Sequence, residues 1–201
     1  MHAGAFVVAI PAGIGLIMLP EQAAARAAAS VYAVSLLVMF GMSAAYHRLA
    51  KSAGARRWMQ RLDHAGIYVL IAGTYVPIAI VGLPWAWGLP ILSMIAGAAL
   101  IGVVIKLSGV RQLQLVGYLL YPAMGWAAVI AGPVLFDSLT GLQFSLIVAG
   151  GLVYTLGMPV LFLRRPDPWP TRFGYHEIWH AFVIVAAALH FVAVASLLTS
   201  V

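Results

Sequence analysis

The sequence contains no cysteine and very few charged residues. Of its 201 residues, 11 are Lys or Arg and 5 are Asp or Glu, so charged side chains make up only 8%. The absence of cysteine excludes disulfide bonds and thiolate metal sites, and it leaves the redox compartment open. A water-soluble domain needs a larger charged surface than this sequence can supply. The sequence therefore predicts an integral membrane protein.

Hydrophobic residues make up 64% of the chain and are grouped in long runs. A helix that spans the hydrocarbon core of a bilayer needs about 20 predominantly apolar residues. Turn-forming residues such as Pro20 and Pro84 separate seven runs of this kind. The runs cover roughly residues 3–19, 27–47, 63–82, 86–106, 114–135, 140–162 and 176–199. We therefore predict an all-α, polytopic protein in which residues 1–201 form a single seven-helix transmembrane domain.

Glycine and alanine dominate several stretches of these runs, for example residues 27–29 and 95–99. Small residues let membrane helices approach each other closely, which favours one tightly packed bundle. An alternative interpretation is that these residues are only tolerated in lipid, and both interpretations fit several of the positions.

Basic residues are concentrated in every second connection between the runs. The second, fourth and sixth connections hold Arg48, Lys51, Arg56, Arg57, Arg61, Lys106, Arg111, Arg164, Arg165 and Arg172. Of the other connections, the first holds Glu21 and Arg26, the third holds no charged residue, and the fifth holds only Asp137. By the positive-inside rule, the basic connections and the amino terminus are predicted to be cytoplasmic and the carboxyl terminus external. Because the basic residues are confined to short loops, the positive net charge does not indicate a nucleic-acid partner.

The polar residues within the runs gather at the predicted cytoplasmic ends of the second, third and seventh runs. They are Ser43, His47, Asp63, His64, His176, Glu177 and His180. His190 is the main exception and lies about 15 Å deeper along the seventh helix, at 1.5 Å per residue. Ionisable groups inside a membrane are costly and usually functional. The grouping at one depth therefore indicates a site.

The spacing of these residues suggests a metal centre. His176 and His180 are four residues apart and lie on one helix face, and Ser43 and His47 have the same spacing. Three imidazoles from two helices, with one position left open, would form a tetrahedral zinc site of the catalytic type. Other first-row metals also suit such ligands. Asp63 would then lie close enough to accept a proton from water at the metal.

Simpler interpretations exist for single residues of this group. A histidine pair four residues apart often makes ordinary hydrogen bonds near a membrane interface. Glu177 points about 100° away from His176 and is expected to cap the helix or face the interface. His64 follows Asp63 but faces a different direction, and Ser43 could bond to a carbonyl of its own helix.

Four sequence stretches carry a family resemblance: SAAYHRL (43–49), LDHAGIYVLIAGTYVP (62–77), VGYLLYPAMGW (116–126) and FGYHEIWH (173–180). Together they resemble the haemolysin III branch of the progestin and adipoQ receptor superfamily. The resemblance implies a seven-helix bundle with zinc bound by three histidines near the cytoplasmic face. These match His47, His176 and His180. The family's aspartate, which contacts zinc-bound water, matches Asp63, and its serine matches Ser43.

The resemblance also bears on substrate and location. The alkaline ceramidases, hydrolases related to this superfamily, imply hydrolysis of a membrane lipid, and the bacterial branch implies a multi-pass protein of the bacterial inner (plasma) membrane. Bacterial members usually carry a polar leader with a Thr-His-Gly element before the first helix. This chain starts Met1-His2-Ala3-Gly4, so we expect that the leader is missing or that the start was assigned late, with His2 as a remnant.

Three function classes remain open. In a zinc-dependent hydrolase, Asp63 would act as the general base and Ser43 as a hydrogen-bond donor to the developing oxyanion. In a receptor or regulatory protein, zinc would only join the helices. A cytolysin is the class that the family name implies, although the sequence has no amphipathic insertion segment. A retinal protein is excluded because the seventh run has no lysine.

Overall fold

The named secondary-structure elements of the described residues are all helices, as the sequence predicts. The computed structural model describes residues 1–170 and 173–200. The α-helices are α1 (His2–Met18), α2 (Ala23–Leu49), α3 (Ala53–Pro77), α4 (Trp85–Ser108), α5 (Gln114–Trp126), α6 (Gly132–Ser138), α7 (Gly141–Leu163) and α8 (Tyr175–Leu198). Within these described residues, the only β-type pairing is an isolated bridge between Trp169 and Phe173.

Six helical segments are long and apolar enough to cross a membrane. They are Ala23–Leu49, Ala53–Gly82, Trp85–Ser108, Arg111–Ser138, Gly141–Leu163 and Tyr175–Leu198. Large apolar side chains remain exposed around the bundle, for example Val8, Leu115 and Leu163 at 66%, 68% and 72%, which suits contact with lipid. Helix α1 has 17 residues. Its length of about 26 Å is less than the hydrocarbon core of about 30 Å, so the seventh span stays a prediction.

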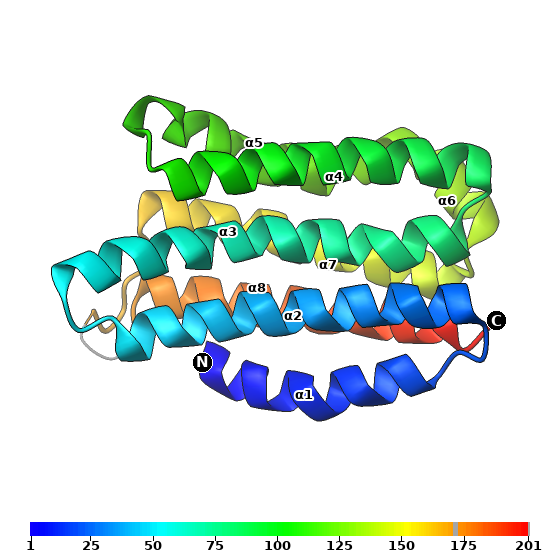
Figure 1. Cartoon of the computed structure of the whole chain (residues 1–201), viewed down its shortest axis with the longest axis horizontal. Helices are drawn as coiled ribbons and strands as arrows, with labels where there is room; N and C mark the ends of the chain where they lie inside the picture. Colours follow the sequence, from blue (N-terminus) through cyan, green and yellow to red (C-terminus); the bar gives the residue numbers. More distant parts are fainter. Residues whose placement is uncertain (171–172, 201) are drawn as a thin grey trace.

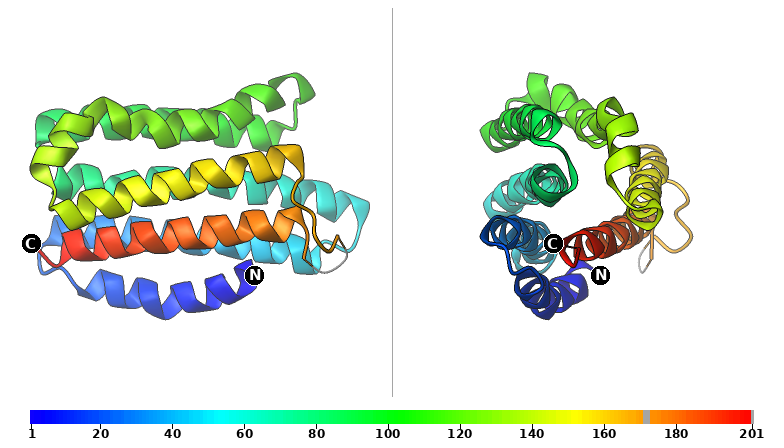
Figure 2. Two further views of the ribbon diagram at one scale, coloured as in Figure 1. Left: turned by 180° about the vertical axis from the view of Figure 1, so that it is seen from behind. Right: turned by 90° about the vertical axis from the view of Figure 1, so that its right-hand side faces the viewer.

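The helices run back and forth along the long axis of the molecule (Figure 1). The α2–α3, α4–α5 and α7–α8 connections lie at the end where α1 begins, and the other connections lie at the opposite end. The end-on view in Figure 2 shows α1 beside both α2 and α8, and α1 contacts both helices. The basic residues predicted for the three connections therefore lie at one end of the bundle, except Arg172, which is outside the described residues.

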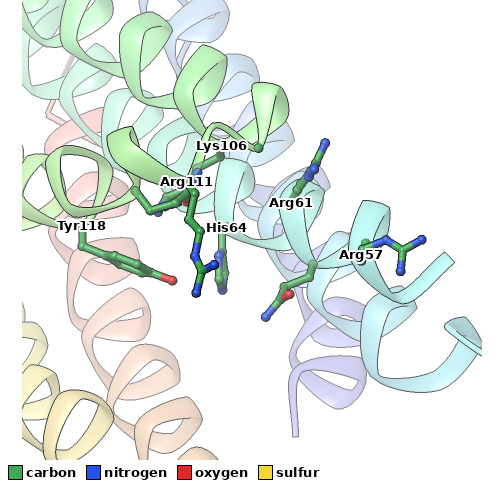
Figure 3. A pocket seen from close by; sticks show the side chains of 9 residues that line it. Arg57, Arg61, His64, Lys106, Arg111 and Tyr118 are labelled. Carbon is green, nitrogen blue, oxygen red and sulfur yellow. Dashed lines mark hydrogen bonds between the residues drawn. The ribbon is translucent and has the colours of Figure 1, made fainter. Parts of the chain in front are cut away.

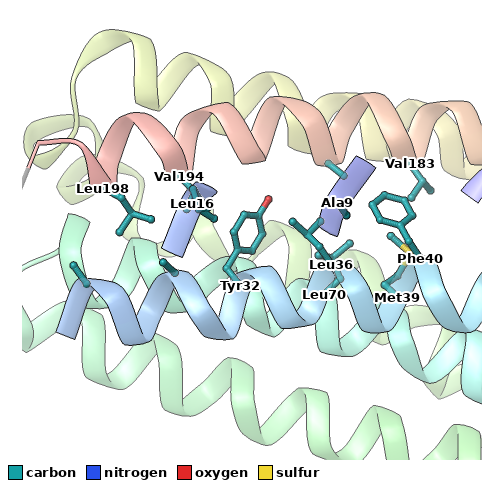
Figure 4. Close-up of a cluster of buried hydrophobic side chains, with 13 residues drawn as sticks. Ala9, Leu16, Tyr32, Leu36, Met39, Phe40, Leu70, Val183, Val194 and Leu198 are labelled. Atoms are coloured by element: carbon teal, nitrogen blue, oxygen red, sulfur yellow. The ribbon is translucent and has the colours of Figure 1, made fainter. Parts of the chain in front are cut away.

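One buried face of α2 organises the core near α1 and α8 (Figure 4). Tyr32, Leu36, Met39 and Phe40 are buried along α2, and their spacing places them on one helix face. They join a cluster with buried residues of α1, α3 and α8, among them Leu16, Leu70 and Val183. In lipid, such packing stabilises the bundle by close contact rather than by removal of apolar surface from water.

Small residues allow close approach between helices, as predicted, but only at some positions. Ala28 and Ala29 are fully buried, and Gly66 of α3 lies so close to the backbone of Met39 in α2 that an added methyl group would be tightly confined. These helices therefore approach closely because the residues are small. Gly97 in α4, in contrast, has no atom within 4 Å of the position of an added methyl group. Gly97 therefore has no close contact that requires a small residue, whereas Ala99 of the same stretch is buried.

Two helices extend beyond the apolar runs from which they were predicted. Helix α3 begins at Ala53 rather than at residue 63, because the Ser52 hydroxyl accepts a hydrogen bond from the Ala55 amide at 3.1 Å and caps the helix. Helix α4 continues to Ser108, so Lys106, predicted to lie in a connection, is in its last turn. Several basic residues that were assigned to the second and fourth connections therefore lie in helices: Arg56, Arg57 and Arg61 in α3, and Lys106 in α4.

The predicted span over residues 114–135 is present, but it is not one continuous α-helix. Helix α5 ends at Trp126, a 3-10 segment follows over Ala127–Ala131, and α6 begins at Gly132 with Pro133 in its first turn. Pro133 has no amide hydrogen for the carbonyl one turn earlier, which interrupts α-helical hydrogen bonding and favours the start of a new helix there. The whole segment still forms one candidate span.

Candidate metal centre

The predicted ligands lie at the ends of two helices at the basic end of the bundle. His47 is in the last turn of α2, and His176 and His180 are in the first two turns of α8. Helix α8 begins at this point because the Glu177 carboxylate accepts a hydrogen bond from the Gly174 amide at 2.9 Å. The expectation that Glu177 caps the helix is therefore confirmed.

The three histidine side chains converge. In the described part of the chain, the ligand atoms of His47, His176 and His180 form a group that all lie within 4.8 Å of one another. The Nε2 atoms of His47 and His176 are 3.2 Å apart. His180 is 7% exposed, His176 is half-buried and His47 is exposed. The histidine triad, as we call these three residues, thus extends from the bundle interior to its surface.

The donor set has the chemistry of a metal site. With metal–nitrogen distances of about 2.0–2.1 Å, two imidazole ligands of a tetrahedral zinc ion lie about 3.3–3.4 Å apart, and the Nε2 atoms of His47 and His176 are 3.2 Å apart. Without an ion, one of these nitrogens can donate its hydrogen to the other, and a metal ion bound by both would take the place of that hydrogen. Imidazole nitrogens suit zinc and several other first-row metals. The triad could therefore hold one such ion.

His2 lies against the triad, which the sequence did not predict. Its ring stacks on that of His180 with centroids 3.8 Å apart, and its Nδ1 is 2.8 Å from the Ser43 hydroxyl oxygen. The side chain is buried, and its Nε2 has no hydrogen-bond partner among the described residues. His2 therefore orients both the His180 ring and the Ser43 hydroxyl. The sequence signal that could have pointed to this contact is the place of His2 at the amino terminus, which is predicted to lie at the same cytoplasmic end as the other polar residues.

Ser43 is connected to the triad through His2, and Asp63 lies near Ser43. The Ser43 side chain is 1% exposed and interacts with the half-buried Asp63 carboxyl group. Ser43 thus lies between Asp63 on α3 and His2 on α1. A hydroxyl has one hydrogen to donate and two lone pairs that accept. If His2 donates its Nδ1 hydrogen to Ser43, the Ser43 hydrogen is available to Asp63 or to a ligand.

The other two histidines have different surroundings. His64 faces Tyr118, with ring centroids 6.0 Å apart, and it lines a pocket whose lining residues include none of the three triad histidines. The Nε2 atom of His190 lies 3.1 Å from the Ile147 carbonyl oxygen of α7. Its imidazole therefore has a hydrogen-bonding role inside the bundle.

Comparisons with known proteins identify the family of this chain. The family model described as Haemolysin-III related matches residues 1–191. Hemolysin-3 of Bacillus cereus is 34% identical over 96% of this chain and 86% of its own length. The Hemolysin-3 homolog of Bacillus subtilis (strain 168) is 33% identical over 82% of this chain and 74% of its own length.

A more distant similarity extends to animals. The adiponectin receptor protein of Drosophila melanogaster is 26% identical over 79% of this chain, but only 39% of that protein is covered. This similarity fits the wider progestin and adipoQ receptor superfamily. Together with the six apolar helices, the matches show that this multi-pass integral membrane protein belongs to the haemolysin-III-related family.

Proposed function

We propose that this protein binds one zinc ion through His47, His176 and His180 and hydrolyses an amide or ester bond of a membrane lipid. The observation that carries the proposal is the convergence of three imidazoles within 4.8 Å at the polar end of an apolar bundle. The half-buried Asp63 carboxyl group lies at the same end. When bound, zinc supplies a Lewis acid that polarises a carbonyl oxygen and acidifies water.

The residues around the triad have complementary roles in this proposal. Asp63 accepts the proton of the water molecule that attacks the lipid carbonyl, as a general base. Ser43 donates its hydrogen to the oxygen that becomes negatively charged, while it accepts a hydrogen bond from His2. His2 stacks on His180 and limits rotation of that imidazole, so the ligand set is held in one geometry.

The hydrolase proposal is tested with purified protein and a panel of acyl lipids that includes ceramide-like amides and glycerolipid esters. We expect free fatty acid to be released by the zinc-loaded protein, to stop after treatment with a chelator, and to resume when zinc is added back. Release would be measured by mass spectrometry. If every lipid of the panel stays intact over zinc-loaded protein, the hydrolase is rejected in favour of a receptor or structural role.

The orientation belongs to the same proposal. We place the amino terminus, the basic connections and the triad on the cytoplasmic side of a bacterial plasma membrane, with α1 as the seventh span. The basic residues at one end of the bundle support this orientation. The exposed apolar side chains of α1, such as Val7 and Met18 at 64% and 75%, support a position in lipid.

A reporter that is active only in the cytoplasm tests this topology. We expect it to be silent when fused after Val201 and active when inserted after Gly109, in the α4–α5 connection. Fused before Met1, it should also be active, because a seventh span brings the amino terminus to the cytoplasmic side. A silent amino-terminal fusion would mean that α1 does not cross the membrane, and activity after Val201 would reverse the whole orientation.

A further inference from the structure

A second polar site lies between the ends of α3, α4 and α5, separate from the histidine triad. It is a pocket of about 470 Å³ at the basic end of the bundle (Figure 3). Its lining residues are Arg57, Gln60, Arg61, His64, Lys106, Gly109, Arg111, Gln114 and Tyr118. Four of these side chains are cationic and none is acidic. The pocket therefore presents positive charge without a carboxylate of its own to balance it.

Lys106 is the most deeply buried of these cations. It is 1% exposed, and its ammonium group donates a hydrogen bond to Oε1 of the Gln114 side-chain amide at 3.2 Å. The same nitrogen lies 3.5 Å from the centre of the Tyr118 ring. Both partners are neutral, and a buried charge is costly unless an opposite charge balances it. An inward-facing cation in a membrane helix of this kind usually marks a ligand site.

The arginines surround the same space at different depths. Arg61 is held in place because it donates to the Leu107 carbonyl at 3.1 Å and lies over the Trp58 ring. Gly109 has a φ of 67°, and an added side chain there would overlap the Arg61 guanidinium. Arg111 points into the pocket with His64, whereas Arg57 lies farther out (Figure 3). The four cations thus line one pocket at different depths.

A phosphate group is the anion that best fits this set of donors. Guanidinium groups bind phosphate oxygens through paired hydrogen bonds, and an ammonium group binds them as a compact charge. Sequence neighbours of the lining residues are apolar and exposed, with Val110 and Leu113 both at 42% and Leu115 at 68%. A ligand with a phosphate at one end and acyl chains at the other would satisfy both features. Basic pockets between membrane helices bind such headgroups in other proteins.

We propose that this pocket binds the phosphate of an anionic membrane lipid. The site is independent of metal binding by the triad, because the lining residues include none of the three triad histidines. Phosphatidylglycerol, with one unbalanced phosphate charge, should bind in preference to phosphatidylcholine, whose choline cancels that charge.

The test counts lipids bound to the purified full chain by native mass spectrometry, after equilibration with phosphatidylglycerol or phosphatidylcholine. The double variant Arg57→Gln with Arg111→Gln should bind phosphatidylglycerol about ten-fold or more weakly, because it loses two charge-assisted contacts. The control is Arg48→Gln with Arg56→Gln. These two arginines are also exposed at this end of the bundle but do not line the pocket, so binding should stay as in the wild type.

Three outcomes would overturn the proposal. Equal binding of the two lipids by the wild type would remove the preference for anionic lipid. An equal loss in both double variants would show that net charge, rather than the pocket, attracts the lipid. Binding of inorganic phosphate that displaces phosphatidylglycerol at equal concentration would assign the pocket to a soluble phosphate ligand instead of a lipid.

Discussion

Replacement of both triad histidines of α8, His176→Ala with His180→Ala, is expected to remove almost all zinc from the purified protein, from about one ion per chain in the wild type. The variant keeps only His47 of the three imidazoles, and a single imidazole cannot hold zinc against dilution. Elemental analysis of protein purified without chelator gives the metal content. Unchanged zinc in the double variant would mean that the triad is not the metal site.

Two controls test whether the loss of zinc is specific to the triad. His190→Ala removes another histidine of α8, one that lies near the Ile147 carbonyl oxygen and away from the triad, and should leave the zinc content unchanged. A ligand that binds only the folded state stabilises it, so a chelator should lower the melting temperature of the wild type. The same chelator should not change the melting temperature of the double variant, which has no zinc to lose.

Asp63→Asn is expected to lower lipid hydrolysis by about 10²-fold or more, the low end of the effect of a general base. Asparagine has nearly the same size and can still form a hydrogen bond with Ser43, but it cannot accept the proton of the attacking water. Zinc content and melting temperature should therefore change only slightly. Initial rates on the most rapidly hydrolysed lipid, measured with zinc-loaded wild type and variant at equal concentration, give the ratio.

A purely structural zinc ion predicts a different pattern. The triad links α2 to α8, so His47→Ala would then lower the melting temperature sharply, and the wild type would hydrolyse no lipid. A variant Asp63→Asn that hydrolyses lipid as fast as the wild type would remove Asp63 from the catalytic role and leave the metal assignment to be judged from the histidine variants.

The candidate site was predicted from the sequence because its main signals are local. The spacing of His176 and His180 fixes their common helix face, and the alternation of apolar runs assigns His47 and Asp63 to the same end of the bundle. In the structure, the three histidines converge and Asp63 lies beside Ser43. Whether zinc binds there and whether Asp63 acts as a base stay predictions.

The basic pocket could not be predicted because it depends on contacts between helices. Lys106 was assigned to a loop as a topology signal, but it is buried against Tyr118 and Gln114. Its position follows from the length of α4 and from the angle at which α5 returns beside it. Neither quantity is a property of a short stretch of sequence.

By itself, the sequence determined the membrane class, the helical architecture and the end at which the polar residues gather. These properties depend on hydrophobic length and helical periodicity, which neighbouring residues set. Only the tertiary structure decided that His2 stacks on His180 and that Lys106 lies in a pocket with arginines from another helix. Such contacts join residues far apart in the chain, and they form only when packing fixes the rotation and depth of each helix.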